Sequence, residues 1–114
     1  IYEMLLRDFT ESGDINGAMA KLDYLQSLGI NAIELMPVQE FDGNDSWGYN
    51  PAFFFAMDKA YGTDRMYKEF IDECHRRGIA VILDVVYNHA PIPSPECGGI
   101  PRTTVRQLII LTLT

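Results

Sequence analysis

The 114-residue sequence predicts an α/β fold with parallel strands, because strand-like and helix-like segments alternate along it. Short apolar segments have the length of strands and lie at residues 2–9, 30–38 and 79–87. Two longer segments repeat apolar residues at steps of three and four, as one face of a helix does, and lie at residues 14–28 and 64–77. The predicted order is therefore strand, helix, strand, helix, strand.

The joints between helix and strand set the direction of the strands. Gly29 and Gly78 each end a predicted helix, and an isoleucine directly after each opens the next strand. So short a joint makes consecutive strands parallel, with right-handed crossovers. This arrangement occurs in TIM barrels and in doubly wound sheets. The loop after the first strand, residues 10–17, lacks both glycine-rich phosphate-binding motifs and carries two carboxylates, which argues against a dinucleotide site.

Composition excludes several classes of partner. Hydrophobic residues make up 47% and charged residues 22%, as in an ordinary globular domain. The net charge of −7 disfavours nucleic acid and anionic membranes, and no apolar stretch approaches the roughly 20 residues of a membrane span. Cys74 and Cys97 do not make a disulfide framework, and we expect Cys74 to be a buried residue of its helix. No feature indicates a cellular compartment.

The connection between the second strand and the second helix, residues 39–62, is unusually long. It follows the carboxyl end of a strand, where α/β folds bind their ligands. Its aromatic residues are Phe41, Trp47, Tyr49, Phe53, Phe54, Phe55 and Tyr61. Aromatic faces beside Asn and Asp oxygens suit a sugar ring, which has an apolar face and a rim of hydroxyls. The alternative is that these residues only pack the loop down, which we expect for Phe53 to Phe55; for Tyr49 both interpretations stay open.

Three motifs taken together resemble the α-amylase family of retaining glycoside hydrolases, which act on α-glucans and contain a TIM barrel. The motifs are Trp47-Gly48-Tyr49-Asn50-Pro51, Tyr61-Gly62-Thr63 and the segment from Asp84 to Asn88 and His89. Residues 2–9 and 25–37 resemble the first two strands of that barrel, and the chain is most similar to pullulanase and debranching-type members and nearby bacterial α-amylases. The resemblance covers residues 1–90, which we expect to form the N-terminal portion of a (β/α)8 TIM barrel.

The resemblance implies roles for five residues. Tyr49 stacks on the sugar at the cleaved bond, and Trp47 belongs to the same substrate-binding element. His89 hydrogen-bonds the primary hydroxyl of that sugar. Asp84 braces the site from inside a strand, and we expect it to have a partner because a buried Asp without one is costly. Asn88 matches a calcium ligand of many members, so calcium is the one cofactor suggested, although the other oxygens it needs would come from elsewhere.

The resemblance places no catalytic residue in this chain. In the family, a nucleophilic Asp, an acid/base Glu and a third Asp lie on strands four, five and seven, and no R-x-D motif occurs here. Residues 91–114 resemble nothing in the family. They contain a Pro/Gly-rich linker followed by an apolar, β-prone tail that could cap an open sheet edge.

We therefore expect a fragment of a retaining glycoside hydrolase that acts on α-glucans such as starch, glycogen or pullulan. The expected partner is an α-glucan oligosaccharide or polysaccharide, and the chain alone is expected to be inactive. Two alternatives stay open: a non-catalytic glucan-binding or interaction module, and a truncated product without function. Exposed sheet edges would make the chain self-associate unless the tail covers the last strand.

Overall fold

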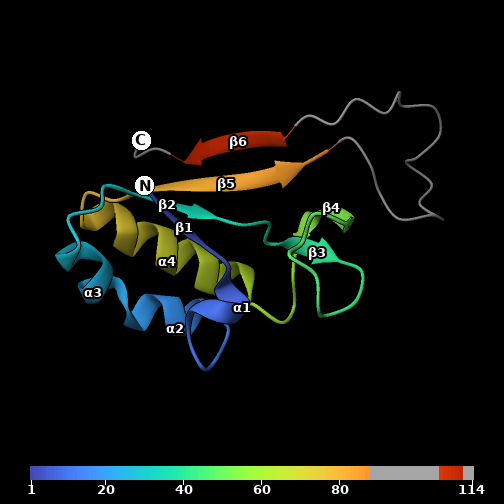
Figure 1. Ribbon diagram of the computed structural model, residues 1–114, viewed down its shortest axis with the longest axis horizontal. Coiled ribbons are helices and arrows are strands. Elements are labelled where there is room, and N and C mark those ends of the chain that lie inside the picture. The colour runs from blue at the N-terminus through green and yellow to red at the C-terminus, as the bar shows by residue number, and fades with distance from the viewer. Residues whose placement is uncertain (88–105, 112–114) are drawn as a thin grey trace.

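The computed structural model describes residues 1–87 and 106–111, and that part of the chain is built on a four-stranded sheet (Figure 1). In spatial order its strands are β1 (Tyr2–Met4), β2 (Ala32–Leu35), β5 (Ala80–Val86) and β6 (Arg106–Leu111). The pairs β1–β2 and β2–β5 are parallel, which confirms the predicted strand direction. The tail contributes β6, which runs antiparallel to β5. This pairing agrees with the expectation that the β-prone tail could cover the open edge of the last parallel strand.

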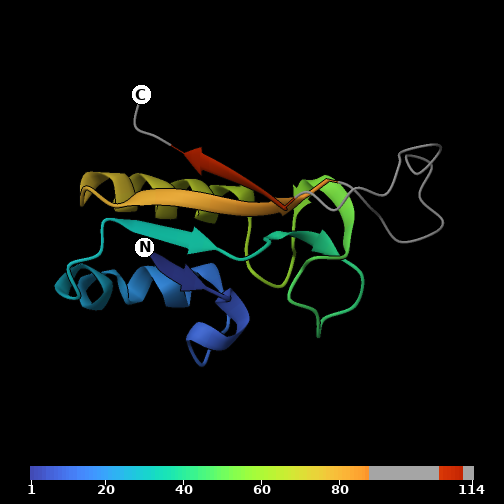
Figure 2. The same cartoon turned by 45° about the horizontal axis from the view of Figure 1, so that its top comes forward.

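Helices cover one face of the sheet (Figure 2). They are α1 (Leu6–Phe9), α2 (Ile15–Ala20), α3 (Leu22–Ser27) and α4 (Asp64–Arg76). Helix and strand residues share one core, in which Ile33, Leu35 and Val81 of the strands and Leu22, Leu25 and Phe70 of the helices are fully buried. Because successive strand residues point to opposite faces, Glu34 lies on the face of β2 that the core residues Ile33 and Leu35 leave free.

Two predicted elements differ from the structure at the N-terminal end. The prediction of a strand over residues 2–9 is wrong for Leu6–Phe9, which form the single turn α1. Only Tyr2–Met4 find partners along β2, so the chain turns once the ladder ends. The single helix predicted from residue 14 to 28 is divided at Lys21, whose φ of −101° and ψ of 6° lie outside the helical region. The apolar face continues across this break, which is why the periodicity does not reveal it.

The second helix and its joint agree with the prediction. The backbone N–H of Met66 donates to the Thr63 hydroxyl at 3.3 Å, which caps α4 at its start. Cys74 is completely buried, as expected, and burial raises the pKa of its thiol to about 12. Gly78 adopts a φ of +73° between α4 and β5. None of the helices in the described ranges is both long and apolar enough to cross a membrane.

The long connection between β2 and α4 contains an antiparallel hairpin of β3 (Gln39–Phe41) and β4 (Pro51–Met57), which the sequence analysis missed. The hairpin lies beyond the carboxyl end of β2 (Figure 1). Its pairing is irregular, with register shifts on both sides of Glu40. A three-residue strand paired irregularly with a run of three phenylalanines has little alternation in sequence, so the hairpin gives only a weak signal.

Candidate functional site

The loop from Asp42 to Asn50 is fastened to the end of β2 by a glycine. Gly48 has a φ of +92°, and a Cβ atom built on it would lie 2.6 Å from the Pro37 carbonyl oxygen and 2.9 Å from the Pro37 Cβ. Only glycine combines this backbone conformation with so close an approach. The middle residue of the Trp-Gly-Tyr element therefore holds its two aromatic neighbours at the carboxyl end of the sheet.

Hydrogen bonds give the same loop a defined shape. The Gly48 N–H donates to the Ser46 hydroxyl at 3.0 Å, and the hydroxyl also contacts the Asn50 side chain. The Asn50 amide donates to the Asp42 carbonyl at 3.1 Å. From outside the loop, Arg7 of α1 donates to the Ser46 carbonyl at 2.9 Å. The polar side chains of the loop therefore hold its shape through hydrogen bonds within the loop.

Tyr49 reaches from this loop to the middle of the sheet. Its hydroxyl donates to Asp84 Oδ2 at 2.6 Å, a charge-assisted bond across 35 residues of sequence. Asp84 lies in β5 and is fully buried, so the bond supplies the partner that its burial requires. Two of the five residues singled out from the sequence are thereby brought together. The contact fixes the direction of the Tyr49 ring relative to β5.

The remaining aromatic residues of the connection divide into two groups. Phe41 and Tyr61 are buried in the core with ring centroids 6.1 Å apart, and Phe54 packs edge-on against Tyr87 at 5.7 Å. The expectation that Phe53 to Phe55 all pack the loop down is wrong for two of them, since Phe53 is 64% and Phe55 99% exposed. On a two-stranded hairpin alternate side chains point outward, so both lie on one face. Trp47 is also exposed, at 62%.

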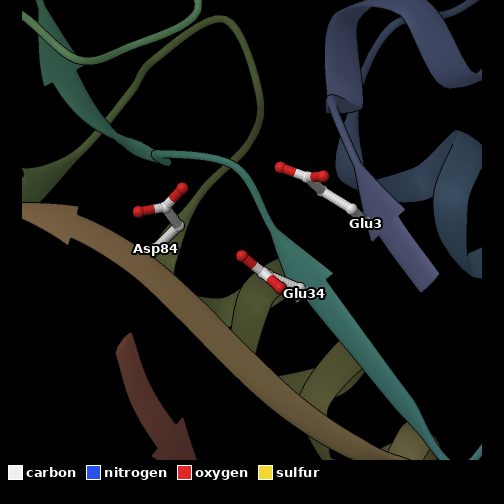
Figure 3. Close-up of side chains that lie close together, drawn as sticks. All are labelled: Glu3, Glu34 and Asp84. Carbon is white, nitrogen blue, oxygen red and sulfur yellow. The ribbon is translucent and has the colours of Figure 1, made fainter. Parts of the chain in front are cut away.

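Three carboxylates converge on the sheet face that carries Asp84 (Figure 3). Glu3 of β1 and Glu34 of β2 are register partners, and one oxygen from each lies within 4.8 Å of the others and of Asp84. Burial increases along the series, from exposed Glu3 through half-buried Glu34 to buried Asp84. The sequence analysis missed Glu3 and Glu34. The available signal was that each is an acidic residue inside an otherwise apolar strand, at matched positions of neighbouring strands.

The carboxylates are oxygen ligands of the type that Ca²⁺ prefers, but three side chains reach even the lower end of its six to eight oxygens only if all three bind through both oxygens. The calcium expectation concerned Asn88 rather than these residues. Asn88 and His89 lie outside the described residues, so their predicted roles stay predictions. The end of β5 contacts Tyr49 through Asp84, and Tyr87, which follows β5, packs on Phe54 of β4.

The chain is similar to known proteins in sequence and in structure. The family described as the α-amylase catalytic domain matches residues 6–93. Malto-oligosyltrehalose trehalohydrolase of Arthrobacter ramosus is 45% identical over 89 residues, or 78% of this chain and 16% of its own length. The enzyme of the same name from Rhizobium sp. (strain M-11) is 47% identical over 102 residues, or 90% of this chain and 17% of its own length. That match extends past residue 93, so the domain boundary predicted at residue 90 stays a prediction.

A solved structure described as a putative α-amylase from Salmonella typhimurium superposes with a TM-score of 0.76 at 46% identity. The superposition covers 80% of this chain and 16% of that protein. The chain thus spans about a sixth of the length of the proteins it matches. The sheet of parallel strands, the motifs at its carboxyl end and these matches together show that the chain belongs to the α-amylase catalytic-domain family.

Proposed function

We propose that this chain provides one sugar-binding wall of a glycoside hydrolase that cleaves α-glucans with retention of configuration. The observation that carries the proposal is the hydrogen bond from Tyr49 to buried Asp84. It anchors an aromatic ring at the carboxyl end of a parallel sheet, where α/β folds bind ligands. The names of the relatives favour a malto-oligosaccharide or a trehalose-capped one over starch, glycogen or pullulan.

Each residue of the wall has a distinct proposed task. The Tyr49 hydroxyl is engaged by Asp84, so the ring offers its flat face to the apolar face of a glucose unit. Trp47, two residues earlier and largely exposed, extends the aromatic surface. His89 follows β5 in sequence and is proposed to hydrogen-bond the primary hydroxyl of the same sugar. Asp84 acts through Tyr49 and is a positioning residue.

Cleavage with retention needs a nucleophilic carboxylate and an acid/base carboxylate about 5–5.5 Å apart. The family resemblance places both on barrel strands four and five, and this chain matches only the first three. Its own residues therefore bind and orient the sugar. We expect the chain to bind malto-oligosaccharide without hydrolysing it.

Fluorescence of Trp47, the single tryptophan of the chain, tests binding directly. Titration with maltoheptaose should give saturable quenching, whereas a cello-oligosaccharide of equal length should give none. Tyr49→Ala should weaken maltoheptaose binding about fivefold or more, if one sugar ring stacked on Tyr49 contributes on the scale of about 1–3 kcal/mol known for a base stacked on an aromatic side chain. Tyr24→Ala is the matched control, because Tyr24 is an exposed tyrosine of α3. Helix α3 lies at the opposite end of the molecule from β3 and β4 (Figure 1). Equal binding by both variants would contradict the role of Tyr49.

A second candidate function is a non-catalytic glucan-binding module, and the exposure of Phe53 and Phe55 favours it. Two outward phenylalanines on one face of β4 extend the aromatic surface beyond Tyr49. If glucan binding is the whole function, Phe55→Ala should weaken maltoheptaose binding as strongly as Tyr49→Ala does. If the chain is one wall of an enzyme site, Tyr49→Ala should dominate. Reducing-sugar release from maltoheptaose by the purified chain would contradict the expectation that its residues bind only.

A further inference from the structure

The strand at the centre of the sheet, β5, is bonded along both of its edges. On one edge β2 pairs in parallel from Ala80 to Leu83, and on the other β6 pairs antiparallel from Val81 to Val86. In a TIM barrel every strand lies between two parallel neighbours. The position next to β5 that a fourth parallel strand needs is therefore held by a strand of the opposite direction.

The pairing of β5 with β6 is regular over six residue pairs, with no register shift, and it includes Asp84 opposite Leu108. β6 begins at Arg106, beyond residue 93 where the family match ends. Without β6, the N–H and C=O groups along one edge of β5 would be unpaired and could pair with another chain. The other edge of the sheet is β1, and with three residues it is too short to offer a comparable template.

We propose that β6 is an intramolecular edge cap, which satisfies the free edge of β5 and excludes from it both a parallel barrel strand and a second copy of this chain. The two arrangements of β5 are mutually exclusive, because one edge of a strand pairs with one neighbour at a time. The chain is thus either closed by its own β6 or open to a further strand. This proposal does not rest on glucan binding, but a barrel in which a fourth parallel strand pairs with β5 would require β6 to leave that edge.

A disulfide test asks whether β6 pairs within one chain. Leu83 and Ile109 are register partners, so their Cα atoms lie within disulfide reach, and Ile109 is partly exposed. The variant Leu83→Cys, Ile109→Cys is oxidised at low micromolar concentration in a Cys97→Ser background; buried Cys74, with its raised pKa, stays a thiol. The control pair Leu83→Cys, Leu111→Cys is two positions out of register, since Leu111 lies opposite Val81. The first pair should give a cross-linked monomer at least about tenfold faster than the control. Cross-linked dimers, or equal rates, would overturn the proposal.

A second test asks what the cap prevents. N–H groups of adjacent strand residues point to opposite edges, so Leu108→Pro with Ile109→Pro removes one donor to β5 whichever residue supplies it. In that variant the β5 amides should exchange hydrogen at least about tenfold faster while α4 keeps its protection, and light scattering should detect association that grows with concentration. Ile109→Thr should behave as the unmodified chain does, as a monomer. A variant that exposes β5 and stays monomeric would overturn the exclusion. If α4 also loses protection, the cross-linking result decides.

Discussion

Two routes lead the chain between strands and helices, and they are built in opposite ways. From α4 to β5 the chain needs only the joint of Arg77 to Ile79, and its side chains on both sides enter one apolar core. From β2 to α4 it takes the long connection through the hairpin, held by the Gly48 approach to Pro37 and by hydrogen bonds of Ser46 and Tyr49. The short joint is stabilised by burial of apolar side chains, which is non-directional and is what holds the fold together. The long connection is held by hydrogen bonds and one close backbone approach, which are directional and which position the candidate site.

The largest predicted effect is a difference in the free energy of unfolding between two phenylalanine variants, one on each route. Phe70 of α4 is fully buried, whereas Phe55 of β4 is 99% exposed. Phe70→Ala removes a large core side chain and should lower the free energy of unfolding by about 3–5 kcal/mol. Phe55→Ala should change it by no more than about 0.5 kcal/mol. Urea unfolding followed by far-UV circular dichroism measures both, and similar losses in the two variants would show that the hairpin belongs to the core.

Two glycines test how strongly the Tyr49 loop is fixed. Gly48→Ala meets both the cost of a left-handed backbone, about 1–2 kcal/mol, and the clash with Pro37. Gly29 also has a positive φ, of +75°, but no described atom lies within 4 Å of a Cβ built on it. Gly29→Ala therefore meets only the cost of the left-handed backbone. Gly48→Ala should therefore destabilise the chain more, in the same urea measurement, and should also abolish maltoheptaose quenching of Trp47. Equal losses would mean that the approach to Pro37 relaxes freely.

The Tyr49–Asp84 bond should have an effect of about 1.5–3 kcal/mol, as for hydrogen bonds to charged groups. Tyr49→Phe keeps the ring and removes the donor to a buried carboxylate, so both stability and maltoheptaose affinity should fall. Tyr24→Phe, on exposed Tyr24, is the control and should be neutral. Unchanged stability in Tyr49→Phe would remove the anchor on which the proposed sugar platform depends.

The smallest predicted effect is on the stability of the chain at low pH and involves Glu73 of α4. Ion pairs with Arg76 and Arg77 lower the pKa of Glu73 to about 2, well below that of an unfolded chain. A lowered folded pKa means that this contribution is present above about pH 4.5 and is lost as the pH falls toward 2. Glu73→Gln should therefore flatten the dependence of stability on pH between those values and leave the dependence above pH 5 unchanged. Urea midpoints measured across pH 2–6 test this.

The same contrast explains what the sequence could predict. The parallel order, α4, the glycine joint and buried Cys74 follow from periodicity and residue type, which report burial. The division at Lys21, the turn α1 and the hairpin depend on where backbone ladders end, and the sequence pattern does not report this. Tyr49 and Asp84 were found through motifs. Glu3 and Glu34 were missed because their meaning depends on strand register, which places two acidic residues side by side.

The Tyr49 anchor also bears on the thermodynamics of ligand capture. Asp84 belongs to a strand that is bonded on both edges, so the acceptor of the Tyr49 hydrogen bond is held in the interior of the sheet. Local opening is least frequent there. The Tyr49 ring, held in this way, has little rotational freedom to lose when a sugar binds. Sugar binding should therefore cost the protein little conformational entropy, because this part of the binding surface is already ordered before the sugar binds.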